Sequence, residues 1–179
     1  MNILVLKSSG HKNGSSNTLA DEFIKGAKES GHSVTDYDVF NADIKNCRGC
    51  DACRRGSGKC VNNDDYENEL KGMIKSADML VFVMPLYYYS WPAALKTVVD
   101  RFYSFSSELS SMGKKTAIIA AAWENSTSAF EVTKATYEKI CGYLNFKDCG
   151  MLFAGGCPTV DVTKSSKHMQ MAYEMGRNL

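Results

Sequence analysis

The sequence predicts an α/β fold in which helices cover both faces of a five-stranded parallel sheet, giving three layers in the order α/β/α. Two observations lead to this fold class. Short aliphatic runs, typical of strands buried on both faces, alternate with amphipathic stretches along all 179 residues. The length also suits one compact domain spanning residues 1–179, and no repeat, linker or low-complexity segment interrupts it.

The first strand and helix carry the clearest signals. Residues 2–7 (NILVLK) form an aliphatic run, and a polar loop at residues 8–17 follows it. From Thr18 onward apolar side chains recur every four positions, which predicts a helix that Asn17 or Thr18 caps and that ends near Gly31.

The remaining elements continue the alternation. Strands are predicted over residues 33–39, 79–84, 116–122 and 147–154, and helices from Pro92, over residues 129–143 and over residues 166–178. Because right-handed crossovers place helices on both sides of a parallel sheet, five strands fit the doubly wound order 2-1-3-4-5 better than a six-stranded dinucleotide-binding order. The one irregular excursion, at about residues 40–65, is rich in cysteine.

Charge and composition narrow the function classes. The chain has 21 Lys and Arg against 20 Asp and Glu, and this net charge of +1 is not the basic excess expected of a nucleic-acid binder. The longest apolar run, residues 79–89, is too short to span a bilayer, and the amino terminus reads as a strand instead of a signal peptide. We therefore expect a cytoplasmic protein with no nucleic-acid or membrane partner.

The loop after the first strand is a candidate phosphate site. Ligands of open α/β sheets bind at the carboxyl ends of the strands, where this loop (SSGHKNGSSNT) lies. It lacks the glycine spacing of dinucleotide folds, and its hydroxyls precede a helix start that attracts anions. The candidate ligands of a terminal monophosphate are Ser9, Ser16, Asn17 and Thr18. The alternative is an ordinary turn with a helix cap.

The loop after the third predicted strand, PLYYYSWP, is a candidate wall for a planar ring. Aromatic faces stack on such rings, and the loop backbone can bond a polar ring edge. The candidates are Pro85, Leu86, Tyr87, Tyr88, Tyr89 and Ser90, with Trp91 as a further aromatic. These aromatics could instead cap the core or form a dimer interface. The charged residues that follow (Lys96, Asp100 and Arg101) are interpreted as a solvated face or an ion pair.

Four of the seven cysteines form a compact motif. Cys47, Cys50, Cys53 and Cys60 have the spacing C-x2-C-x2-C-x6-C, and four thiolates can hold a [4Fe-4S] cluster. Five basic residues surround them, and these could offset an anionic cluster. Zinc is less compatible with this spacing. The thiols could also simply pack in a folded loop or form a transient disulfide.

Three segments together resemble the flavodoxin-like family of NAD(P)H-dependent FMN reductases and its iron-sulfur flavoprotein branch. They are SSGHKNGSSNT, CRGCDACRRGSGKCVNNDD and PLYYYSWPAALKTVVDRF, in family order. The resemblance implies a flavodoxin-like fold, FMN held at the first and third loops, a homodimer or homotetramer, and in the iron-sulfur branch a cluster that exchanges electrons with FMN. This sequence departs from the family pattern at Gly10, where many relatives have proline.

The leading functional hypothesis is an oxidoreductase that passes electrons from NAD(P)H through bound FMN to a quinone, flavin, metal or iron-sulfur acceptor. No catalytic acid or base is assigned, because the cofactor carries the chemistry. One alternative is a non-enzymatic electron carrier, although such flavodoxins tend to be strongly acidic and this chain is not. Another is a thiol-based sensor without flavin.

Overall fold

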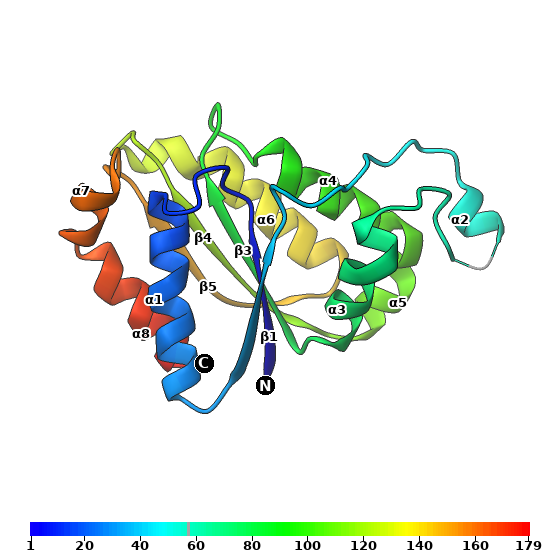
Figure 1. Ribbon diagram of the computed structural model, residues 1–179, viewed down its shortest axis with the longest axis horizontal. Helices are drawn as coiled ribbons and strands as arrows, with labels where there is room; N and C mark the ends of the chain where they lie inside the picture. The colour runs from blue at the N-terminus through cyan, green and yellow to red at the C-terminus, as the bar shows by residue number, and fades with distance from the viewer. Residues whose placement is uncertain (57) are drawn as a thin grey trace.

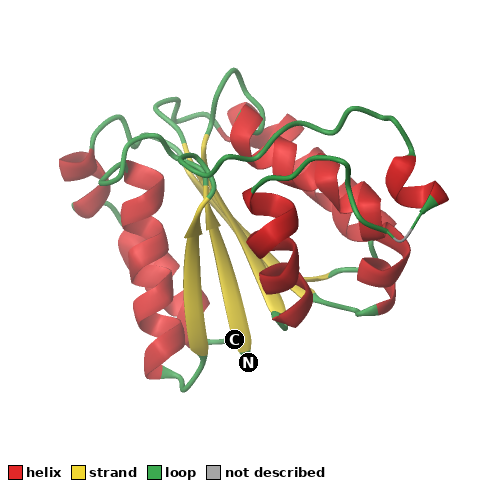
Figure 2. Cartoon of the chain, turned by 45° about the vertical axis from the view of Figure 1, so that its right-hand side comes forward, coloured by secondary structure: helices red, strands yellow, loops and turns green. Residues whose placement is uncertain are grey.

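The sheet has five parallel strands in the order β2-β1-β3-β4-β5, as the sequence predicts. The structure is a computed structural model that describes residues 1–56 and 58–179. Position 57, within the expected cysteine-rich excursion, lies outside the described residues. The three layers are visible in Figure 1, and Figure 2 shows helices on both sides of the sheet.

The elements alternate between strands and helices through most of the chain. The strands are β1 (Asn2–Lys7), β2 (Ser33–Asp38), β3 (Met79–Pro85), β4 (Lys115–Ala121) and β5 (Lys147–Ala154). The α-helices are α1 (Ser15–Glu29), α2 (Ala52–Arg55), α3 (Lys71–Ser76), α4 (Ala93–Arg101), α5 (Ser106–Ser111), α6 (Glu131–Tyr143), α7 (Val160–Lys164) and α8 (His168–Arg177). Short non-α turns are η1 (Tyr66–Leu70), η2 (Phe102–Phe105) and η3 (Thr127–Phe130).

Strand alternation divides the core into two halves. Ile3 and Val5 of β1 face α1 and α8, where Phe23 and Ala172 are fully buried. The neighbouring positions of β1 face the other side, where η1, α3, α4, α5 and α6 supply the covering side chains. Because successive side chains of a strand point to opposite faces, one aliphatic strand can serve both halves.

Several predicted boundaries are corrected. The first helix begins at Ser15, three residues before the predicted start, with Gly14 as its N-cap. Pro92 is the N-cap of α4 and not its first helical residue. The first predicted turn of the 129–143 helix belongs largely to η3. Small polar residues form both caps and first turns, so pattern alone does not separate them. In the described ranges, no helix combines the length and hydrophobicity needed to cross a bilayer.

Candidate functional site

A cleft of about 750 Å³ lies at the carboxyl edge of the sheet. Loops that follow β1, β3, β4 and β5 line it, and these loops gather at the top of Figure 1. Because parallel strands end at the same edge, residues distant in sequence meet here. The cleft is thus where the topology places a ligand.

Backbone hydrogen bonds continue the sheet into these loops. Ser8 donates from both its N–H and its hydroxyl to the Val83 carbonyl, at 3.1 and 2.8 Å. The Leu86 N–H donates to Ala121 at 2.8 Å, which joins the β3 and β4 loops. The Cys157 N–H in turn donates to the Ala122 carbonyl at 2.8 Å. The floor of the cleft is therefore built on the sheet itself.

The start of α1 is suited to an anion. No side chain caps the helix, and the first-turn N–H groups of a helix have no intrahelical acceptors. The Ser16 hydroxyl lies in this turn, is buried, and has no hydrogen-bond partner among the described residues. Lys12 and His11 line the cleft, and no carboxylate is among its described lining residues. The helix dipole and Lys12 both favour a negative charge here.

The other predicted phosphate ligands are placed differently. Ser9 lines the cleft, and its hydroxyl accepts from the His11 N–H at 3.2 Å. The Asn17 amide donates to the carbonyls of His11 and Lys12 at 3.2 and 3.1 Å, so Asn17 holds the loop from behind. Thr18 is not among the lining residues.

The tyrosine segment forms a tight turn at the edge of the cleft. Pro85, Leu86 and Tyr87 line the cleft, whereas Tyr88, Tyr89 and Ser90 do not. Tyr87 and Ser90 exchange backbone hydrogen bonds at 3.3 and 3.1 Å, and the two residues between them have φ of 48° and 62°. Tyr88 is 99% exposed and Tyr89 59%. Two consecutive left-handed tyrosines are strained, because their Cβ atoms crowd the backbone.

Trp91 does not belong to the aromatic wall that the sequence suggests. It is 7% exposed and packs on Phe82, with ring centroids 5.4 Å apart. The alternative interpretation, in which these aromatics cap the core, describes Trp91.

Two cleft segments were not expected from the sequence. They are residues 121–123 at the end of β4 and just beyond it, which include the 83%-exposed Trp123, and residues 157–160 after β5. Ser15 was also missed, and its hydroxyl donates to the Cys157 carbonyl at 3.1 Å. The available signal was topological, because loops after β4 and β5 must end at the same edge as the loop after β1.

The four clustered cysteines meet at a second place. Cys47, Cys50, Cys53 and Cys60 all line one cavity of about 20 Å³, room for about one water. All four are free thiols. In residues 1–56 and 58–179, no three His, Cys, Asp or Glu side chains are arranged to hold a metal ion. The four thiols therefore face one small cavity, but in the described residues they are not arranged as a metal site, and the cavity is smaller than a cluster.

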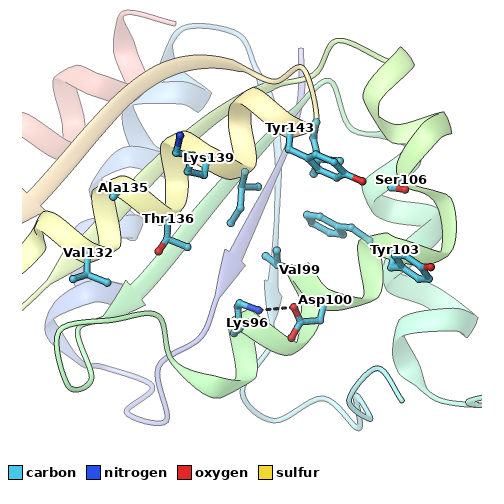
Figure 3. Close-up of a pocket in the computed structure, with 13 residues that line it drawn as sticks. Lys96, Val99, Asp100, Tyr103, Ser106, Val132, Ala135, Thr136, Lys139 and Tyr143 are labelled. Atoms are coloured by element: carbon cyan, nitrogen blue, oxygen red, sulfur yellow. Dashed lines mark hydrogen bonds and ion pairs between the residues drawn. The ribbon is translucent and has the colours of Figure 1, made fainter. Parts of the chain in front are cut away.

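An apolar groove of about 700 Å³ separates α4 from α6 (Figure 3). Val99 and Tyr103 line one side, and Val132, Ile140 and Tyr143 line the other. Lys96 and Asp100 form an exposed ion pair of 2.5 Å at the rim, as expected from their spacing. Val132 and Tyr143 are 55% and 73% exposed, so α6 presents an apolar face to solvent.

A family model described as the flavodoxin-like fold matches residues 1–177. The chain belongs to this family. The flavodoxin-like fold and the family resemblance predicted from the sequence are therefore confirmed.

Curated relatives of this flavodoxin-like chain carry the name iron-sulfur flavoprotein. One, from Archaeoglobus fulgidus, is 30% identical over 106 residues, which cover 59% of this chain and 47% of that protein. Another, from Clostridioides difficile, is 25% identical over 156 residues, covering 85% and 66% of the two chains. The chain spans about half the length of most of the curated relatives it matches.

Solved structures agree on the fold. An NAD(P)H:quinone oxidoreductase from Methanothermobacter marburgensis has a TM-score of 0.79 at 21% identity, covering 99% of this flavodoxin-like chain and 95% of that one. An FMN-dependent NADH-azoreductase from Bacillus anthracis, in complex with FMN, has a TM-score of 0.68 at 15% identity, covering 99% and 97%. At these identities the likeness is one of fold.

Proposed function

We propose that the protein is an oxidoreductase that binds FMN in the carboxyl-edge cleft and passes electrons from NAD(P)H to a small-molecule acceptor. The observation that carries the proposal is the buried hydroxyl of Ser16, which has no hydrogen-bond partner in the described part of the chain and lies at an uncapped helix start. A buried hydroxyl without a partner costs free energy unless a ligand satisfies it. A phosphate dianion at this position would supply the missing acceptor.

The residues of the cleft have distinct tasks in this proposal. The first-turn N–H groups of α1 and the Ser16 hydroxyl donate to the phosphate, and Lys12 balances its charge. The apolar segment Pro85–Tyr87 packs against the ring and its backbone orients the polar edge, while Trp123 from the β4 loop covers the open side. Bound FMN supplies the electron-transfer chemistry, and the chain supplies position and electrostatics.

The relatives' names support an enzyme over a carrier. Two structural neighbours are titled NAD(P)H:quinone oxidoreductase and FMN-dependent NADH-azoreductase. The near-neutral net charge of this chain also differs from the acidic surface expected of a flavodoxin that docks with protein partners.

The test combines a spectrum with turnover. Protein purified without oxygen should carry flavin absorbance bands, and apoprotein should regain them when FMN is added. The loaded protein should then oxidise NAD(P)H with quinone or ferricyanide as acceptor. Flavin bands without turnover would favour the electron carrier, and the failure of the apoprotein to bind FMN would refute the proposal.

A second candidate function is electron transfer through a [4Fe-4S] cluster on the cysteine loop. The supporting observation is that four free thiols line one cavity. Cys47, Cys50, Cys53 and Cys60 would be the ligands, and the loop would open to enlarge the cavity. About four irons and four acid-labile sulfides per chain are expected after anoxic reconstitution. Iron that remains after all four cysteines are changed to serine would contradict this assignment.

For the protein's own partner we propose a second copy, seated on the groove between α4 and α6. The apolar face of α6 lacks a partner within the described chain, and Lys139 at the groove makes no ion pair there. A two-fold contact would bury this face against itself. Val132→Glu should shift a dimer toward monomer in analytical ultracentrifugation, whereas Val162→Glu, at another exposed valine on α7, should not. A monomeric wild-type protein would rule out this contact.

A further inference from the structure

The cysteine loop has a narrow base where its two ends lie side by side. The Asp43 N–H donates to the Asp65 carboxylate at 2.7 Å, and the Asp65 N–H returns a bond to the Asp43 carbonyl at 3.0 Å. Closer to the cysteines, the Asn62 amide donates to the Asn46 carbonyl at 3.2 Å. All four clustered cysteines lie between these paired ends.

Arg101, the last residue of α4, fills this base. Its Nη1 donates to the Lys45 carbonyl at 2.8 Å and to the Asp64 Oδ2 at 2.6 Å, and Nη2 reaches the Asp64 Oδ1 at 3.3 Å. The same carboxylate accepts the Lys45 N–H at 3.0 Å. One guanidinium therefore joins Lys45, which precedes the four cysteines in the chain, to Asp64, which follows them.

The burial of this contact was not predicted. The side chains of Arg101 and Asp64 are 1% and 0% exposed, although the sequence favoured a solvated face or an ordinary ion pair. Leu95 and Val98 share the buried side of α4 with Arg101, whereas Lys96 and Asp100 lie on the exposed side. A charge is retained at such a depth only when its partners satisfy it.

Part of the donor capacity beneath the loop is unused. The guanidinium lies 4.6 Å from the Tyr66 ring centroid, and Arg101 Nε and the Tyr66 hydroxyl have no hydrogen-bond partner among the described residues. Burial would lower the pKa of Arg101, but the bonds and charge of Asp64, with a contribution from Cys60, outweigh it and raise that pKa. Arg101 therefore keeps its positive charge beneath the cysteine loop.

We propose that Arg101 is the positioning residue of the cysteine loop: it clamps Lys45 to Asp64 so that the four thiols stay on one cavity and bind a thiophilic metal centre together. This inference rests on the second candidate function above. For the thiols to bind one metal centre together, the loop beyond the base has to open while the base stays fixed. Arg101 touches no thiol-bound group itself, and it acts through the backbone it holds.

The experiment compares Arg101→Gln and Arg101→Lys with Arg177→Gln, an exposed arginine at the end of α8. Reduced protein is titrated anaerobically with Cd²⁺ in the presence of a competing chelator. Binding is followed by the absorbance of the cadmium–thiolate charge-transfer band. Wild type and Arg177→Gln should bind one Cd²⁺ per chain with equal affinity. Loss of a contact that supports metal ligands typically weakens metal binding by roughly 10- to 100-fold. We expect a loss of this size in Cd²⁺ affinity for Arg101→Gln. Arg101→Lys should have an affinity between those of wild type and Arg101→Gln.

Alkylation separates a clamp from general destabilisation. Mass spectrometry should show faster iodoacetamide labelling of the four loop cysteines in Arg101→Gln, with Cys141 and Cys157 unchanged because both are buried in the core. If Arg101→Gln does not fold, Asp64→Asn removes the other half of the contact and takes its place.

Three outcomes would refute either the clamp by Arg101 or the metal site on which it rests, and they can be told apart. Equal Cd²⁺ affinity and equal loop labelling in wild type and Arg101→Gln would refute the clamp. Faster labelling of Cys141 together with the loop would make Arg101 a general stabiliser instead. If wild type binds no Cd²⁺ through its thiols, the metal-site hypothesis fails, and the labelling pattern still decides whether Arg101 holds the loop.

Discussion

The indole nitrogen of Trp91 donates to the backbone carbonyl of Thr133 at 3.2 Å and fastens the start of α4 to α6. The Thr133 hydroxyl donates to the Tyr89 carbonyl at 3.4 Å, so the loop at the edge of the cleft is tied to α6 twice. These contacts explain how a strained, exposed turn keeps a defined place beside the candidate cofactor.

Trp91→Phe should lower the free energy of unfolding by about 1 kcal/mol, because it removes the bond to Thr133 and keeps most of the packing. Trp91→Ala should cost about 3–5 kcal/mol through the cavity it leaves. Urea unfolding measures both. Trp123→Phe is the control, since Trp123 is 83% exposed, and a comparable loss there would contradict this assignment.

Ser16→Ala should weaken FMN binding at least 10-fold, because a hydrogen bond to a charged group contributes about 1.5–3 kcal/mol. Fluorescence quenching of added FMN gives the dissociation constant. Ser30→Ala, at the opposite end of α1, is the matched control. Equal dissociation constants for wild type and Ser16→Ala would remove this hydroxyl from the phosphate site.

Tyr89→Gly should raise the free energy of unfolding by about 1 kcal/mol, because glycine adopts the left-handed conformation without a Cβ clash. The control is the opposite kind of change, in which a side chain is added at a glycine with positive φ. Gly31→Ala places a side chain at φ of 83° where nothing lies within 4 Å, and it should destabilise by a similar amount. Thermal unfolding measures both variants. If Tyr89→Gly proves destabilising, side-chain contacts of Tyr89 stabilise the turn more than its backbone strain weakens it.

Gly26→Ala should be severely destabilising, because a Cβ at residue 26 of α1 would lie 2.2 Å from the Tyr173 carbonyl oxygen of α8. The contact partner is backbone, so it cannot rotate away. Gly142→Ala in α6 meets nothing within 4 Å and should gain up to about 1 kcal/mol from helix propensity. Similar unfolding midpoints for the two variants would show that α1 and α8 separate easily.

Acid should weaken the ion pair between Arg101 and Asp64 at the base of the cysteine loop. Burial would raise the pKa of Asp64, but the hydrogen bonds from Arg101 outweigh it and hold that pKa below its ordinary value of 3.8. A carboxyl with a lowered folded pKa stabilises the protein above its unfolded pKa and loses that contribution as pH falls. The difference in unfolding free energy between wild type and Asp64→Asn, about 3–5 kcal/mol at pH 7, should therefore shrink below about pH 4. A pH-independent difference would contradict the ion pair.

The order of strands and helices could be predicted from the sequence, and so could about half of the segments that line the cleft. Strand and helix order follow from hydrophobic periodicity, and the ends of β1 and β3 follow from topology. Trp123 and the segment after β5 carried no chemical signal of their own, since their place depends on where the last strands end. The depth of Arg101 was also hidden, because burial of a charge depends on a partner 37 residues away.

The glycine contact between α1 and α8 constrains the order in which the chain can mature. Residue 26 and its partner Gly176 let the two helices touch backbone to backbone, yet α8 begins only at residue 168. During synthesis α1 therefore leaves the ribosome long before its packing partner α8 exists. Until then the side of α1 that packs on α8 stays open to chaperones and to neighbouring nascent chains, although Phe23 also belongs to the core cluster that β1 and β3 help to form.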